Sequence, residues 1–421
     1  MSIKRIRVTH FKNFKELEIE LGKFNVLIGA NASGKSNFIG IFKFLRDIAN
    51  SGLDNALSMQ GGVEYLRNIN IGASEDFSLK VVSDQEFGFI GRMKEDLIEI
   101  NIYEIVYEFA LKFKKRGLRF EIAKDKLIQK YKFDKFIKIT RLKEKKKKIE
   151  EEELGPGEII ISRDHGKVKI DLHKPEEVSI KEDDIYPPFL REEKLPLDKL
   201  LLQSPFFSMP PLEEIFSDIS IYDFDPKLPK KATPITGKAE LEEDGSNLSI
   251  ILKKITENEE RKRKLFNLVK EVLPFISNLE VEKSADKSLL FKLQETYFRK
   301  EYLPASLISD GTINITALIV ALYFEKKPLT IIEEPERNIH PYLISKVVNM
   351  MRDASQKKQI IVTTHNPEIV KYAGLDNILL VSRDKEGFST ISRPADKREL
   401  KTFLENEIGI EELYVQNLLE V

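Results

Sequence analysis

The chain has 421 residues, of which 41% are apolar and 33% are charged. Its 68 basic and 69 acidic residues leave a net charge of −1, which excludes a global attraction to nucleic acid, so any such contact needs a local basic patch. The absence of cysteine excludes disulfides, thiolate catalysis and iron–sulfur clusters. This length suits two or three domains, or one large domain with an insertion.

The start of the chain shows no secretory signal pattern, because residues 3–8 alternate polar and apolar side chains as a strand does. The longest apolar run, near residues 313–324, is interrupted by Asn314 and Thr316 and is too short to cross a bilayer. We therefore expect a cytoplasmic protein without membrane association.

The first 125 residues predict strands around one long helix. Phe38, Ile41, Phe42, Leu45 and Ile48 recur at helical spacing. The predicted helix covers residues 35–50, and the predicted strands cover residues 3–9, 15–20, 24–28, 77–82 and 101–123, the last with turns at 114–117.

Between the strand at 24–28 and that helix lies GANASGKS, residues 29–36, which fits the phosphate-binding loop pattern G-x-x-x-x-G-K-[ST]. Glycines let successive backbone N–H groups point at phosphate oxygens, and a helix start adds its unpaired N–H groups. Lys35 would reach the β- and γ-phosphates, and the Ser36 hydroxyl would bind Mg²⁺. A chance match in a glycine turn is the alternative, and the two flanking elements favour nucleotide binding.

The composition changes after residue 125. Residues 126–148 contain eleven basic and two acidic residues, a net charge of +9, and four glutamates follow at 150–153. Such runs are typical of a solvated helix or a flexible connector, although Phe133 and Phe136 among the lysines also suit contact with a DNA backbone. We expect a hairpin at 158–171 turning at 164–166, ordered packing at 187–211, and an inserted subdomain over 126–215.

From residue 216 onward, predicted strands and helices alternate, which indicates an α/β sheet. The predicted helices cover 245–256, 259–273, 313–324 and 341–354, and the predicted strands cover 279–283, 289–294, 329–333, 359–363 and 377–382. The last 20 residues predict an amphipathic helix.

The strand at 329–333 ends in two acids, Glu333 and Glu334, followed by Pro335. Metal-assisted phosphoryl transfer uses such a pair: the first carboxylate is held near Mg²⁺, and the second polarises the attacking water. An exposed acidic strand end is the ordinary alternative, which the upstream phosphate loop makes less favoured.

Two further motifs carry candidate site residues. Ser309, Asp310, Gly311 and Thr312 open the predicted helix, either as a simple N-cap or as an anion site at a helix N-terminus. His365 ends the predicted strand at 359–363 and is either structural or a sensor of a γ-phosphate. The same two interpretations apply to His340.

Together these motifs resemble the ABC-type ATPase heads of the RecF/SMC class, and most closely the ATPases related to the N-terminal half of the overcoming-lysogenization-defect (OLD) nucleases. The resemblance covers residues 1–125 and about 216–385. It is carried by residues 6–14, 29–36, 244–248, 309–312, 333–341 and 363–367.

This resemblance implies an α/β P-loop NTPase fold of the ABC-ATPase type, a mixed sheet core with an antiparallel β lobe, carrying the insertion as an α+β subdomain. The implied domains are an ATPase lobe at 1–125, the insertion at 126–215, a second lobe at 216–400 and a C-terminal helix at 401–421.

The resemblance also implies site roles and a homodimer that sandwiches two ATP molecules. Lys35, Glu334 as the base and His365 as the switch would be catalytic, and Ser36 and Glu333 would bind Mg²⁺. Residues expected to contact ATP are Gly29, Asn31, Ser33, Gly34, Lys35, Ser36 and Asn37, with Ser309 and Gly311 acting on ATP held by the second copy. Asn338 would lie in the D-loop region.

Three departures from that pattern are visible. Glu333 stands where an aspartate is usual, and Asp310 stands where the wider class often has glycine. None of Gln60, Gln85 and Gln129 has the context of a Q-loop glutamine. Residues 37–308 contain no sustained heptads, so we expect no SMC-type coiled-coil arms, and the residues after the last strand are too few for a Toprim nuclease domain.

Two functions follow as hypotheses. The first is an ATP-hydrolysing dimer acting in DNA repair or phage defence. The second is an ATP-gated scaffold of low turnover that controls a separate nuclease or toxin. A transporter ATPase is a third, weaker hypothesis, because the S-D-G signature and the E-E-P-E run argue against it.

Overall fold

The computed structural model describes residues 2–93, 96–114, 120–141, 147–164, 166–178, 182, 194–204, 207, 212–283, 287–298, 301–396, 409–416 and 419. The chain forms two compact units. Unit 1 comprises residues 1–21, 36–218 and 383–390, and unit 2 comprises residues 22–35, 219–382 and 391–421. The chain thus passes from unit 2 to unit 1 between Lys35 and Ser36, inside the predicted phosphate loop.

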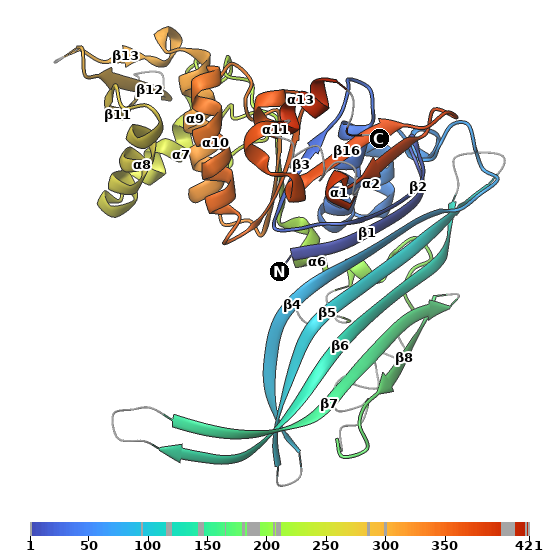
Figure 1. Cartoon of the computed structure of the whole chain (residues 1–421). Helices are drawn as coiled ribbons and strands as arrows, with labels where there is room; N and C mark the ends of the chain where they lie inside the picture. The colour runs from blue at the N-terminus through green and yellow to red at the C-terminus, as the bar shows by residue number, and fades with distance from the viewer. Residues whose placement is uncertain are drawn as a thin grey trace. The chain divides into compact units, whose positions relative to one another are not determined.

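Unit 1 is built on one seven-stranded antiparallel sheet in the order β2-β1-β4-β5-β6-β7-β8. Long strands bend along their length in Figure 1. The alternating sequence buries one face of each strand, as Ile98, Ile100 and Ile102 of β5 show. The strands are β1 (Ser2–Phe11), β2 (Phe14–Glu20), β4 (Phe77–Met93), β5 (Asp96–Phe113), β6 (Phe120–Arg141), β7 (Lys147–Asp164) and β8 (Lys167–His173).

An aromatic cluster joins helix α1 (Lys35–Ser51) to this sheet. Phe44 of α1 lies 5.9 Å from Phe77 and 6.4 Å from Phe11 between ring centroids, and Phe77 lies 5.7 Å from Phe109. Edge-on ring pairs of this kind stabilise a core beyond the area they bury. The remaining helical elements of unit 1 are short: α2 (Leu53–Met59), α3 (Val63–Leu66), η1 (Leu201–Gln203) and α6 (Leu212–Ser217).

The basic run expected to form a solvated helix or connector is instead strand β6 over its described part. Its lysines alternate with Leu127, Tyr131 and Phe133, which are buried. The expected boundary at residue 126 falls inside β6, and the described residues of β6, β7 and β8 continue the sheet that begins with β1, so this part of the expected inserted α+β subdomain is an extension of the antiparallel lobe. Residues 179–181 and 183–193 lie outside the described part.

Carboxylates of neighbouring strands pair with the lysines of β6. Lys130 lies 2.7 Å from Glu104 of β5, and Lys132 lies 3.1 Å from Glu153 of β7. These cross-strand ion pairs offset part of the charge that the sequence concentrates in this segment. The described part of the run is therefore a mixed-charge surface.

Unit 2 is built around a six-stranded sheet in the order β17-β16-β3-β15-β14-β9, in which β16, β3, β15, β14 and β9 run parallel. In register, Thr364 of β15 lies opposite Ile28 of β3, and Thr363 lies opposite Glu333 of β14. The carboxyl ends of these three strands therefore meet at one edge. The strands are β3 (Phe24–Ile28), β9 (Ile219–Tyr222), β14 (Leu329–Glu333), β15 (Gln359–Thr364), β16 (Ile378–Arg383) and β17 (Ser389–Ser392).

Helices cover this sheet and enclose the core of unit 2. Helix α9 (Asp310–Tyr323) is apolar almost all round, as a fully buried helix must be, and it buries Ile313, Leu318 and Ile319. The other helices are α7 (Leu248–Thr256), α8 (Glu259–Val272), α10 (Pro341–Ala354), α11 (Pro367–Ala373) and α13 (Ile410–Val415), with 3₁₀ turns η2 (Ala305–Leu307), η3 (Leu375–Asn377) and η4 (Pro394–Asp396).

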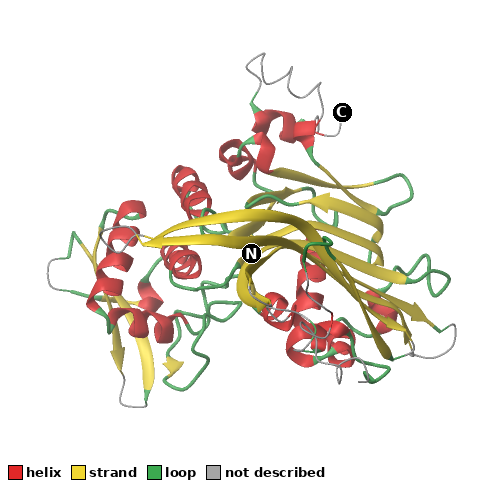
Figure 2. Cartoon of the chain, turned by 90° about the horizontal axis from the view of Figure 1, so that it is seen from below, coloured by secondary structure: helices red, strands yellow, loops and turns green. Residues whose placement is uncertain are grey.

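A second, four-stranded antiparallel sheet completes unit 2, and Figure 2 shows helices beside its short strands. Its strands are β10 (Thr233–Pro234), β11 (Ile276–Lys283), β12 (Ser288–Glu295) and β13 (Leu303–Pro304). No helix within the described ranges is long and apolar enough to cross a membrane.

Most predicted elements are confirmed. The predicted strands at 24–28 and 329–333 coincide with β3 and β14, and the predicted helix at 341–354 coincides with α10. The hairpin at 158–171 corresponds to the ends of β7 and β8, whose turn includes His165, outside the described residues. The strands predicted over 101–123, with turns at 114–117, correspond to β5 and the start of β6, and residues 115–119 between them are not described. A helix was predicted over residues 401–421. Residues 401–408 lie outside the described part, and α13 (Ile410–Val415) confirms a helix in the segment that follows.

Candidate functional site

The loop of residues 29–34 begins directly after Ile28, the last residue of β3. A Cβ at Gly29 would lie 2.3 Å from the carbonyl oxygen of Val381, so no side chain fits where β3 ends beside β16. Ala32 and Gly34 have φ values of 62° and 122°, and the N–H of Ser33 donates to the carbonyl of Ala30 at 3.2 Å. These left-handed positions curl the loop as a phosphate-binding nest requires.

Lys35 folds back over this loop. Its Nζ donates to the carbonyl oxygens of Gly29 at 2.7 Å and Ala30 at 3.0 Å. Burial lowers the pKa of Lys35, while the charges of Glu334 and Glu333 act to raise it. The amine therefore lies within electrostatic reach of both acids at the end of β14.

Glu334 has a backbone conformation that few non-glycine residues adopt. Its φ is 45°, and its N–H donates to the carbonyl of Thr363 at 2.9 Å. Such left-handed residues cost free energy and are concentrated at functional sites. The turn directs the Glu334 side chain away from the strand and toward the end of β15.

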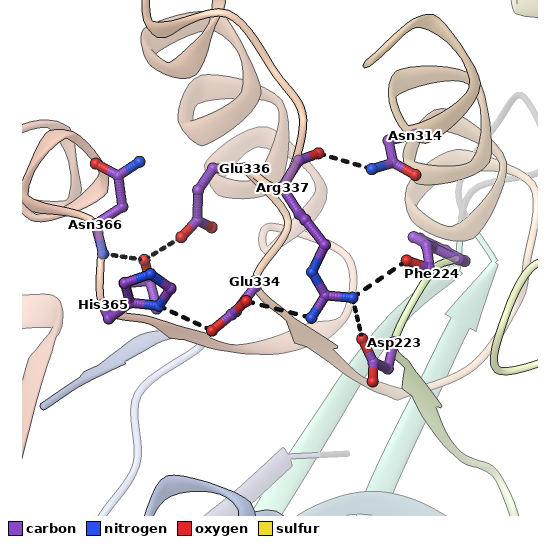
Figure 3. A network of polar contacts seen from close by, with 9 residues as sticks. Asp223, Phe224, Asn314, Glu334, Glu336, Arg337, His365 and Asn366 are labelled. Carbon is purple, nitrogen blue, oxygen red and sulfur yellow. Dashed lines mark hydrogen bonds and ion pairs between the residues drawn. The ribbon is translucent and has the colours of Figure 1, made fainter. Parts of the chain in front are cut away.

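Both carboxylate oxygens of Glu334 have a partner (Figure 3). Oε1 lies 2.8 Å from Nδ1 of His365, and Oε2 accepts a hydrogen bond from Nη2 of Arg337 at 3.2 Å. Burial acts to raise the pKa of Glu334, but the hydrogen bonds and charges of Arg337 and His365 outweigh it and leave the pKa below its usual value. The carboxylate is thus held ionised.

Arg337 extends the network to strand β9. Its Nη1 donates to Oδ1 of Asp223 at 2.8 Å and to the carbonyl of Phe224 at 3.4 Å, and its own carbonyl accepts from Nδ2 of Asn314 at 2.7 Å (Figure 3). Arg337 and Asp223 were not among the predicted site residues. They lie 114 positions apart, and only the parallel pairing of β9 with β14 brings them together.

A second, more deeply buried link lies beside this network. Oε1 of Glu336 accepts from the hydroxyl of Thr364, which in turn accepts from the N–H of Asn366 at 2.9 Å. Burial raises the pKa of Glu336. The link ties the turn after β14 to the turn that carries His365.

The segment at 309–312 forms a capped helix start. The Ser309 hydroxyl accepts from the N–H of Thr312 at 3.2 Å, which confirms the N-cap interpretation. A Cβ at Gly311 would lie 2.5 Å from the carbonyl of Asn338, so glycine permits α9 to approach that loop. Asp310 forms an ion pair with Lys230. A role for Ser309 and Gly311 toward a second copy stays a prediction.

The structure therefore brings together Lys35, Glu333, Glu334 and His365 at one edge of the unit 2 sheet. Ser36 and Asn37 follow directly at the start of α1, in unit 1. Asn31 is exposed at the tip of the loop, whereas Ser33 and Gly34 are buried. His340 caps α10 by accepting from the N–H of Tyr342 at 3.2 Å, which is a structural role.

Comparisons with known proteins identify the family of the chain. A family described as "AAA domain, putative AbiEii toxin, Type IV TA system" matches residues 24–371. A Septu protein PtuA from Bacillus mycoides (strain KBAB4) is 26% identical over 143 residues, which are 31% of this chain and 20% of that protein. The chain thus matches only about a fifth of the length of this relative.

Solved structures show the fold. An SMC head bound to the C-winged helix domain of ScpA superposes with a TM-score of 0.50 at 14% identity, covering 93% of this chain and 98% of that one. The SMC head domain from Thermotoga maritima gives a TM-score of 0.43 at 13% identity, with coverages of 93% and 99%. With the family match covering most of its length, the chain belongs to this family of AAA domains and has the P-loop ATPase fold of the SMC-head type.

Proposed function

We propose that the protein is an ABC-type ATPase that binds ATP with Mg²⁺ and hydrolyses it. The observation that supports this most is the meeting of three strand ends: the loop with Lys35 follows β3, Glu334 follows β14 and His365 follows β15. Ligands of open α/β sheets bind beyond the carboxyl ends of the strands, at such an edge.

The residues present fit a nucleotide triphosphate and its metal. The loop over 29–34 offers backbone N–H groups, and Lys35 would exchange its loop carbonyls for the β- and γ-phosphates. Ser36 and Glu333 would hold Mg²⁺, which keeps most of its coordination for water and phosphate and neutralises charge on the phosphates when bound. The remaining contacts would come from Gly29, Asn31, Ser33, Gly34 and Asn37.

Glu334 is proposed as the general base for water. Its pKa lies below the usual range, so it is ionised at neutral pH and can accept a proton. His365, which contacts Oε1 of Glu334 and whose side chain is 53% exposed, would orient the base and sense the γ-phosphate. As the water oxygen bonds to the γ-phosphorus and the bond from that phosphorus to the ADP oxygen breaks, the water would transfer its proton to Glu334, and ADP would leave.

We further propose that two copies sandwich ATP, with Ser309 and Gly311 at the start of α9 completing the partner's site. The exposed N-terminus of α9 would contribute N–H donors to a phosphate. Asp310 is offset there by its ion pair with Lys230.

The test is a pair of variants. Lys35→Ala should abolish ATP binding, measured by calorimetry, because the loop loses its phosphate ligand. Glu334→Gln should keep ATP binding, lower the hydrolysis rate at least about 100-fold and trap a dimer on size exclusion with ATP. Hydrolysis by Glu334→Gln at the normal rate would contradict the assignment of the base.

The biological output is proposed more broadly. The resemblance to RecF/SMC heads supports a role in DNA repair or phage defence. We propose that the protein acts in the cytoplasm and that DNA is one of its binding partners. The family description names a toxin of a toxin–antitoxin system, which supports the second candidate, an ATP-gated protein of low turnover that controls a separate effector. Measuring turnover together with copurifying partners separates the two.

A further inference from the structure

Arg337 lies within the segment 333–341, but no role at the site was predicted for it. It is the one residue in the described part of the chain that hydrogen-bonds both Glu334 and Asp223, and its carbonyl is held by Asn314 of α9. Its guanidinium is therefore fixed between the ends of β14 and β9 (Figure 3). A planar guanidinium can do this because it donates in several fixed directions.

We propose that Arg337, anchored by Asp223, is a positioning residue that fixes the Glu334 carboxylate for hydrolysis. This inference rests on the proposed function of Glu334 as the base. Arg337 would act through Glu334 and would not contact ATP itself. Asp223 and the carbonyl of Phe224 anchor the far side of the guanidinium, so that its other nitrogen keeps a constant direction toward Oε2 of Glu334.

Geometry supports this role over a purely structural one. His365 and Arg337 hold different oxygens of Glu334, which together determine the plane of the carboxylate. A carboxylate oxygen accepts more than one hydrogen bond, so both contacts leave a lone pair for the proton of water. The left-handed backbone at Glu334 adds a third restraint, because its N–H is held by Thr363.

Charge supports it as well. The groups that act on Glu334 come from every neighbouring strand end: Lys35 after β3, His365 after β15, Asp223 after β9 through Arg337, and Glu333 and Glu336 on its own segment. Arg337 is a permanent cation among them, whereas His365 is charged only when protonated. Arg337 therefore presents a permanent positive charge to the Glu334 carboxylate, in addition to its hydrogen bond to Oε2.

The experiment measures the pH profile of kcat and the KM for ATP in the full chain carrying Arg337→Gln. We expect kcat to fall about tenfold or more, because the base loses its orientation, while KM changes little, because Lys35 and the loop are untouched. The acid limb of the kcat profile should move to higher pH, because the pKa of Glu334 rises when the cation is removed.

Graded variants separate positioning from folding. Arg337→Lys keeps the positive charge but loses the planar guanidinium that donates in two directions at once. Its acid limb should therefore lie where that of the wild type lies, while its kcat should fall between those of Arg337→Gln and the wild type. Asp223→Asn should lower kcat by a smaller factor than Arg337→Gln. Arg352→Gln is the control, because Arg352 is also a hydrogen-bonded arginine, but it donates only to the backbone carbonyls of Tyr372 and Ala373, away from Glu334.

The outcomes are distinguishable. An unchanged kcat and pH profile in Arg337→Gln, or the same losses in Arg352→Gln, would overturn the positioning role. Normal hydrolysis by Glu334→Gln would instead overturn the proposed function. Should Arg337→Gln fail to fold by circular dichroism, Arg337→Lys and Asp223→Asn decide, and an unchanged kcat in both rejects the proposal.

Discussion

At the scale of single residues, the site depends on backbone positions that admit one residue type or one conformation. Gly29 and Gly311 each face a carbonyl oxygen that an added Cβ would meet at 2.3 Å and 2.5 Å. Glu334 and Asn338 adopt φ values of 45° and 62°. These restraints limit the conformations open to the phosphate loop, the start of α9 and the turn after β14.

Gly311→Ala tests whether the approach of α9 to Asn338 matters. The new methyl group would overlap the Asn338 carbonyl, so the chain must shift, and we expect a loss of about 1–3 kcal/mol in the free energy of unfolding. Chemical denaturation measures this loss. Gly22→Ala is the control, because its added Cβ would meet nothing nearer than 3.6 Å. Equal free energies of unfolding for the two variants would contradict this prediction, because the Asn338 loop would then move aside without a cost in stability.

The residues that the sequence could identify are those set by a local pattern. Lys35, Glu333 and Glu334 each follow a short apolar strand within their own motif, and the structure brings them together. Arg337 and Asp223 could not be identified, because their contact crosses 114 positions and depends on which strands are neighbours in the sheet. The sequence of either segment alone does not predict which distant strand it pairs with.

At the scale of elements, β6 shows how composition can mislead. The net charge of residues 126–148 suggested a solvated segment, yet lysines alternate with Leu127, Tyr131 and Phe133, and this period of two is that of a strand with one buried face. The net charge of a segment does not show this alternation of lysines and buried apolar residues. The carboxylates that pair with these lysines lie on β5 and β7, and so the sequence segment alone does not reveal them.

Strand β6 also carries a buried acid whose ionisation opposes folding. Asp125 accepts from the hydroxyl of Tyr107 at 2.9 Å and from the N–H of Leu201 at 2.8 Å, but burial dominates and raises the pKa of Asp125 to about 7. The folded state therefore binds a proton between about pH 4 and pH 7 that the unfolded state has released. Stability contributed by this group is full at low pH and is lost as the pH rises through this window.

Asp125→Asn should remove that pH dependence. Its amide stays neutral, and Tyr107 can turn its hydroxyl to accept from the new N–H group. Relative to the variant, the wild type should lose up to about 4 kcal/mol of unfolding free energy between pH 4 and pH 7, at about 1.4 kcal/mol for each pKa unit. Denaturation at a series of pH values measures this difference. Asp134→Asn, on the same strand, is the control, and parallel curves for wild type and Asp125→Asn would contradict the prediction.

At the scale of the whole molecule, the class of fold was predictable and the division of the chain was not. Strand and helix alternation after residue 216, with the phosphate loop before it, predicted an α/β ATPase fold, and the six-stranded sheet and the family match confirm it. The sequence placed the loop with the N-terminal strands, whereas β3 pairs with β15 and β16 of the C-terminal half. The chain returns to that sheet only after the whole antiparallel lobe.

The proposed sandwich makes a prediction about two copies that neither copy alone can satisfy. If Ser309 acts on ATP held by the partner, each site combines Lys35 of one chain with Ser309 of the other. Lys35→Ala and Ser309→Ala should then each lose hydrolysis alone. A mixed dimer would unite both defects in one site and leave the other site intact, so a 1:1 mixture should recover about a quarter of the wild-type rate if dimers form at random.

The two variants are mixed and incubated with ATP so that dimers exchange subunits. The steady-state rate of ATP hydrolysis then measures this recovery. The matched control mixes Lys35→Ala with Glu334→Gln, because both residues belong to the same site of one chain. The mixed dimer then carries one defect in each site, so this mixture should stay inactive. Recovery in both mixtures, or in neither, would contradict an arrangement in which Ser309 completes the site of the second copy, since only a contribution from the partner separates the two pairs.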